Sequence, residues 1–194
     1  QVGSSAASDV YKRQFLYYAP RIFEAGGIGQ SAALLNSVGI GLTNVIFTYI
    51  GISLIDKLGR KSLMYIGSIG YIISLTLISL SFILDWGGIL LPIFLFLFIA
   101  SHAIGQGAII WVYISEIFPN NIRSYGQSFG VSTHWVLAAI IPSLIPFLFS
   151  WIGPGIVFVF FAFMMVLQLL FTHFVMPETK GVSLEDLSKK LIKN

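Results

Sequence analysis

The sequence predicts an all-α fold, a polytopic transmembrane helix bundle, on three observations. Hydrophobic residues make up 56% of the 194 residues and charged residues 10%, whereas soluble domains carry about 25% charged residues. The apolar runs are continuous rather than alternating, which favours helices over strands because lipid requires backbone groups to be satisfied internally. Four long stretches also lack any Asp, Glu, Lys or Arg, and these are residues 25–55, 62–84, 86–115 and 124–177.

The first residues do not fit this pattern. Segment 1–14, QVGSSAASDVYKRQ, is polar and lacks the apolar core of a signal peptide, so we interpret it as a leader that is disordered or foreign to the native protein. Residues 15–25 predict part of a helix, which is too short to span a membrane. We therefore expect a truncated reading frame, with a genuine flexible tail as the alternative.

Five complete spans are predicted after this partial helix, because a helix of about 20 apolar residues crosses the hydrocarbon core. The last uncharged stretch holds two of them, divided by SWIGPG at 150–155. In the third span, GQG at 105–107 interrupts the apolar run and predicts a bend beside a cavity in which Gln106 could hydrogen-bond. The spans are predicted at 31–55, 62–84, 89–115, 125–149 and 155–176.

Basic residues lie in alternate loops. DKLGRK, EIFPNNIR and the tail 177–194 carry Lys or Arg, whereas GGIGQ, DWGG and SWIGPG carry none. The positive-inside rule therefore predicts a multi-pass protein of the cell membrane with a cytoplasmic C-terminal tail. Because the charges sit in short loops between spans, we expect the lipid bilayer and no nucleic acid as a partner. With no cysteine and three isolated histidines, no metal site and no cofactor are predicted.

Four motifs in order resemble the C-terminal half of a sugar porter of the major facilitator superfamily. They are FLYYAP at 15–20, DKLGRK at 56–61, WVYISEIFPNNIR at 111–123 and PETKG at 177–181. The resemblance implies a six-helix half with its first helix truncated, whose N-terminal half is missing. It also implies that the protein is a transporter and not an enzyme. Such a transporter moves a monosaccharide by alternating access, in which two halves rock against each other.

The resemblance also implies a latch of charged residues at the cytoplasmic ends of the spans. Asp56 and Arg60 can pair with charges on neighbouring helix ends, and Gly59 permits a tight turn between two helices. Glu116 is an acid on the basic side of the membrane, which topology alone does not explain. The resemblance implies Glu116 and Arg123 as partners of Asp56 and Arg60, and it places Glu178 in the signature after the last helix. The alternative is that the basic residues serve only as a topology signal.

The resemblance also implies a substrate site, with Trp111 as the floor of the sugar pocket. The alternative for Trp111 is the interfacial aromatic belt, and for His134 a hydrogen bond that bridges helices. Asn44, a polar residue in the middle of a span, contacts either sugar or a neighbouring helix. The residues that the family positions imply for the site are Tyr17, Asn44, Gly107, Trp111, His134 and Trp135.

Three departures from the family pattern leave alternatives open. Ala108 replaces a proline, Ala138 replaces an asparagine, and DVYKRQ stands where Gln-Gln-x-x-Gly-x-Asn is expected. One alternative is a transporter of another solute, such as a polyol or an organic anion, although an anion carrier would want an Arg or Lys within a span. The other is a membrane enzyme that uses His102 or His134, although neither has an acid three or four residues away.

Overall fold

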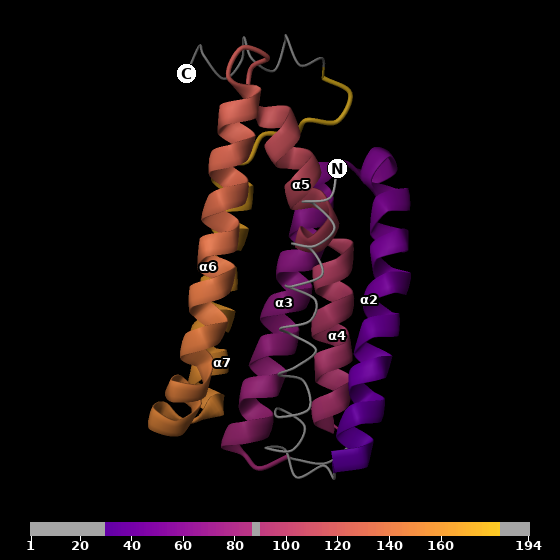
Figure 1. The fold of residues 1–194 in the computed structure, drawn as a ribbon. Helices are drawn as coiled ribbons and strands as arrows, with labels where there is room; N and C mark the ends of the chain where they lie inside the picture. Colours follow the sequence, from indigo (N-terminus) through magenta and orange to yellow (C-terminus); the bar gives the residue numbers. More distant parts are fainter. Residues whose placement is uncertain (1–29, 87–89, 183–194) are drawn as a thin grey trace.

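The structure, a computed structural model, describes residues 30–86 and 90–182, and these residues form helices and short connections without strands. This confirms the predicted all-α class. The suspected leader 1–14, the partial helix 15–25 with Tyr17, and the tail beyond residue 182 lie outside the described residues. The helices are α2 (Gln30–Leu58), α3 (Arg60–Ile83), α4 (Leu90–Ile104), α5 (Gln106–Ile117), α6 (Arg123–Ile152) and α7 (Pro154–Phe174) (Figure 1).

Five helical stretches within the described part of the chain are long and apolar enough to cross a membrane. Each overlaps one predicted span, and the third combines α4 and α5. The protein is therefore a multi-pass membrane protein. The stretches are Val38–Leu58, Arg60–Ile83, Leu90–Ile117, Arg123–Ile152 and Pro154–Phe174.

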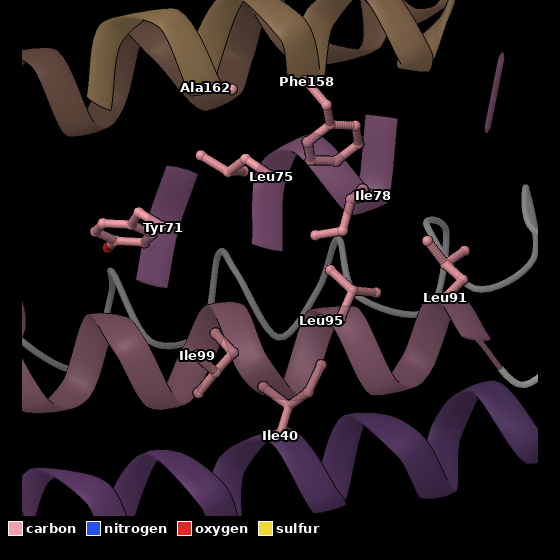
Figure 2. Close-up of a cluster of buried hydrophobic side chains, with 9 residues drawn as sticks. All are labelled: Ile40, Tyr71, Leu75, Ile78, Leu91, Leu95, Ile99, Phe158 and Ala162. Carbon is pink, nitrogen blue, oxygen red and sulfur yellow. The ribbon is translucent and has the colours of Figure 1, made fainter. Parts of the chain in front are cut away.

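Helix α3 occupies the centre of the bundle. It packs against α7 on one side and α4 on the other, while α2 lies along α4 and α6 contacts α7 and α5 (Figure 1). Figure 2 shows the resulting core, in which side chains from α3 interlock with those of α4, α2 and α7. Helix α6, in contrast, buries none of its residues. The core cluster comprises Ile40, Tyr71, Leu75, Ile78, Leu91, Leu95, Ile99, Phe158 and Ala162.

The bend predicted in the third span is a helix interruption at Gly105, where φ is −90° and ψ is −106°. A Cβ atom added to Gly105 would lie 2.7 Å from the Cα atom of Gly67, so the backbone of α3 touches the break directly. Gln106 is buried, and its Nε2 donates to Ser68 Oγ at 3.3 Å. The break therefore forms without the family's proline, and Gln106 packs between helices instead of facing the cavity that we expected.

Candidate functional site

The turn between α2 and α3 brings several charged residues together at one end of the bundle, the upper end in Figure 1. Gly59 is the one residue between these helices and has a φ of +90°, a conformation that side chains disfavour. A Cβ atom on Gly59 would also lie 2.5 Å from Glu178 Oε2. Glycine at this position therefore serves both the backbone turn and the close approach of a carboxylate.

Arg60 holds two carboxylates. Its Nη2 donates to Glu116 Oε1 at 2.9 Å and its Nε to Glu116 Oε2 at 3.2 Å, a two-point contact that fixes the relative orientation of the groups. Its Nη1 donates to Asp56 Oδ1 at 3.0 Å. The Arg60 and Glu116 side chains are only 12% and 20% exposed, whereas that of Asp56 is 81% exposed. The Glu116 contact is therefore the shielded one, and an exposed pair such as Arg60–Asp56 contributes about 0–1 kcal/mol.

Glu178 caps α3 from a distant part of the chain. Its Oε1 accepts the backbone N–H of Arg60 and its Oε2 that of Lys61, both at 3.0 Å. Oε1 also accepts the N–H groups of Thr179 and Lys180 at 3.0 Å. The first amides of a helix have no partner within the helix, and a negative charge is favourable beside them. The carboxylate therefore supplies the cap that the local sequence of α3 lacks.

The same segment makes further contacts that sequence reasoning missed. Thr179 Oγ1 donates to Glu116 Oε2 at 2.6 Å, and so joins the carboxylate that Arg60 holds. Lys180 Nζ donates at 2.6 Å to the backbone oxygen of Lys57, in the last turn of α2. A cation there complements the negative end of the helix dipole. Met176 is buried in a second apolar cluster with Ile55, Leu63, Met64 and Ile109.

We call Asp56, Arg60, Glu116, Glu178 and Thr179 the charge cluster. Arg123, which we expected to pair within it, forms no ion pair with its carboxylates among the described residues. Its Nε donates to the backbone oxygen of Phe118 at 3.3 Å, and its Nη2 is buried without a hydrogen-bond partner among the described residues. In this structure Arg123 therefore ties the turn between α5 and α6 and does not join α2 to α5.

A second group, the aromatic cluster, consists of Trp111 on α5 with His134 and Trp135 on α6. The rings of Trp111 and His134 meet edge to face with centroids 5.0 Å apart, and those of Trp111 and Trp135 stack at 6.4 Å. The His134 and Trp135 rings lie 5.4 Å apart. Trp111 remains 39% exposed. Three of the six predicted substrate residues thus come together from two helices.

Gly107 and Asn44, which are also predicted for the substrate site, contact other side chains. A Cβ atom on Gly107 would be 3.0 Å from His102 Nε2, so this glycine makes room for the His102 ring. The Nδ1 atom of that ring is hydrogen-bonded to the hydroxyl of Tyr71 on α3, a contact that the sequence did not indicate. Asn44 is on α2, where its Oδ1 accepts from Thr48 Oγ1 at 3.5 Å in the same helix. Tyr17 is outside the described residues.

Residues 11–191 match the model of the family "Sugar (and other) transporter", and the chain belongs to this family. This membership confirms the resemblance to sugar porters and places the protein among transporters rather than enzymes.

Individual relatives agree with this membership. The chain is 38% identical over 178 residues to the arabinose-proton symporter of Bacillus subtilis (strain 168), which covers 91% of this chain and 38% of that protein. It is 37% identical over 180 residues to the D-xylose transporter of Levilactobacillus brevis. That alignment covers 91% of this chain and 39% of the transporter. The major facilitator proton:xylose symporter XylE bound to 6-bromo-6-deoxy-D-glucose has a similar fold, with a TM-score of 0.82 at 31% identity, covering 93% of this chain and 40% of that one. The chain thus spans about two fifths of the length of these proteins.

Proposed function

We propose that the chain forms part of a membrane transporter that moves a monosaccharide by alternating access. The observation that carries this proposal is the aromatic cluster, in which two indoles and an imidazole converge from α5 and α6. The C–H face of a sugar packs on an indole, and its hydroxyls need hydrogen-bonding groups such as the imidazole. The sugars for which two relatives are named, arabinose and xylose, support the same substrate class.

In this proposal Trp111 forms the floor of the substrate site, with Trp135 stacked behind it and His134 as a hydrogen-bonding group. Gly107, Asn44 and Tyr17 complete the part of the site that this chain contributes. A separate N-terminal half of the transporter supplies the facing wall, since transporters of this kind bind substrate between two bodies that rock against each other.

The charge cluster is proposed as a latch for one state of the transport cycle. The Arg60–Glu116 contact joins the start of α3 to the last turn of α5, so these helix ends cannot separate while it is intact. Glu178 and Gly59 hold Arg60 in place, and Asp56 adds an exposed contact. Arg123, whose Nη2 has no partner among the described residues, offers a donor to the state in which the latch is open.

The proposed orientation places the charge cluster and the C-terminus in the cytoplasm, because the loops at that end carry the Lys and Arg residues. The measurement is a pair of C-terminal fusions, one to a reporter that is active only in the cytoplasm and one to a reporter that is active only outside it. Activity of the external reporter alone would contradict the orientation.

Counterflow in proteoliposomes tests the proposed substrate class. The full-length protein that contains this chain, preloaded with unlabelled xylose or arabinose, is expected to accumulate the labelled sugar transiently. A polyol or an organic anion at the same concentration should not replace the internal sugar. For an anion, the uncharged stretches 62–84 and 86–115 offer no cation within the membrane. Counterflow that is driven by a polyol or anion and not by either sugar would refute the substrate assignment.

A further inference from the structure

A polar cluster separate from both groups above lies between α3 and α7, and consists of Lys61, Tyr65 and His173. The Tyr65 hydroxyl and His173 Nδ1 are 2.8 Å apart, and Lys61 Nζ donates to the backbone oxygen of His173 at 3.0 Å. The backbone N–H of Lys61 belongs to the charge cluster through Glu178, but its ammonium group lies with His173. The transport mechanism proposed above makes no use of these three side chains.

This cluster has more donors than acceptors. An ammonium group has three donors, and the carbonyl of His173 takes one of them. The Tyr65 hydroxyl and His173 Nδ1 share one proton in their hydrogen bond. If the hydroxyl donates, the proton on Nε2 remains free to donate to a ligand, and if Nδ1 donates, the hydroxyl proton does. Both ion pairs formed by residues 30–86 and 90–182 belong to Arg60, so no described carboxylate lies within 4.0 Å of Lys61 Nζ. The cluster therefore carries a positive charge without a described carboxylate at ion-pair distance.

Its position is at the ends of two membrane-crossing helices, since α3 begins at Arg60 and α7 ends at Phe174. Apolar side chains continue from it along the same helix faces. Ile69, four residues after Tyr65, is 49% exposed, and Leu170, three residues before His173, is 46% exposed. A cationic, donor-rich group at the end of a span, with exposed apolar surface beside it, suits a lipid whose headgroup is anionic.

We propose that Lys61, Tyr65 and His173 bind the phosphate of an anionic phospholipid, with its acyl chains against the exposed apolar side chains of α3 and α7. Lys61 provides the charge, and the Tyr65–His173 pair provides a further donor. A free phosphate ion would satisfy the same donors, but it would leave the adjoining apolar surface without a partner, so we favour the lipid.

Native mass spectrometry of the detergent-purified full-length protein that contains this chain tests this site, with phosphatidylglycerol as the probe and phosphatidylcholine as the neutral lipid. Wild type should retain phosphatidylglycerol preferentially. Lys61→Gln should weaken that retention by about tenfold, the scale of one charge-assisted hydrogen bond. Lys57→Gln is the matched control, because it removes the same charge two residues before Gly59, outside the cluster. It should change retention by less than about twofold, well under that scale.

Other results of this experiment would contradict the lipid site or assign it to another ligand. Equal losses in the two lysine variants, or no preference for phosphatidylglycerol in wild type, would overturn it. Inorganic phosphate at millimolar concentration should not displace the lipid, and full displacement would assign the site to a soluble anion instead. If Lys61→Gln loses its helical circular dichroism, Tyr65→Phe tests the same site without a change of charge. It should reduce retention by a smaller factor, and unchanged retention in that variant would refute the donor role.

Discussion

Replacing Glu178 by glutamine keeps the shape of the side chain but removes its charge and one of its two acceptors. In the structure Oε1 accepts three backbone N–H groups and Oε2 accepts that of Lys61. A glutamine has a single oxygen, so its NH₂ group must face one set of these donors. Loss of a helix N-cap costs about 0.5–2 kcal/mol, and loss of a negative charge at the helix start about 0.3–1 kcal/mol more. We therefore expect Glu178→Gln to destabilise the first turn of α3 by about 1–3 kcal/mol.

Amide hydrogen exchange of the detergent-purified chain measures this loss directly. Exchange at the N–H groups of Arg60 and Lys61 should accelerate by about 5- to 150-fold, because about 1.36 kcal/mol corresponds to a factor of ten. Amides in the middle of α3 should be unaffected, since the core packing around them is unchanged. The increase should therefore be confined to the start of the helix.

Asp56→Asn provides the matched control for this experiment. It also removes one carboxylate at the same end of the bundle, but Asp56 is 81% exposed and, among the described residues, accepts from the Arg60 side chain alone. Its loss should cost less than about 1 kcal/mol, and exchange at the start of α3 should rise by less than about fivefold. Equal acceleration in the two variants would refute capping by Glu178, since it would mean that any lost acid at this end has the same effect.

Two further predictions concern the turn and the substrate site. Gly59→Ala should lower the thermal stability of the chain more than Gly181→Ala does. Both positions have a positive φ, but of the two only Gly59 would place a Cβ against the Glu178 carboxylate. Equal losses in the two variants would mean that backbone strain of about 1–2 kcal/mol accounts for the whole effect. Trp111→Ala in the full-length transporter should weaken sugar binding by about 1–3 kcal/mol at normal surface expression, measured by equilibrium binding of labelled sugar. Trp151→Ala, at a residue that is 86% exposed, is the control; unchanged affinity in Trp111→Ala would assign Trp111 to the aromatic belt.

The sequence was sufficient to predict the helical spans, because the physics of lipid acts on each segment separately. The uncharged run between Lys61 and Asp85 is long enough to span a membrane, and this does not depend on the segments around it. Helix α3 occupies that run. The same applies to the break in the third span, since GQG weakens the helix locally. The position of the break at Gly105 also depends on contact with Gly67, which no local pattern contains.

Contacts between distant segments were the part that the sequence did not reveal. Thr179 lies 63 residues from Glu116 along the chain, and Lys180 lies 123 residues from Lys57, so no helical or strand periodicity relates them. The resemblance to a family indicated that Glu178 belongs to the latch, but not that its acceptors serve the start of α3. It also led to an expected partner role for Arg123, whose Nε donates in this structure to the backbone oxygen of Phe118, five residues away.

Helix α5 connects the two clusters, and its geometry bears on how the proposed latch acts on the proposed substrate site. It has 12 residues, and Trp111 and Glu116 are separated along it by about 7.5 Å at 1.5 Å per residue. Its first end is the interruption at Gly105, and its last turn carries the carboxylate that both Arg60 and Thr179 hold. We propose that the interruption at Gly105 acts as a hinge, about which α5 tilts once its fastened end is released. Release of Glu116 would then move Trp111 relative to His134 on α6, so that opening of the latch and reshaping of the aromatic cluster are one motion of one rigid element.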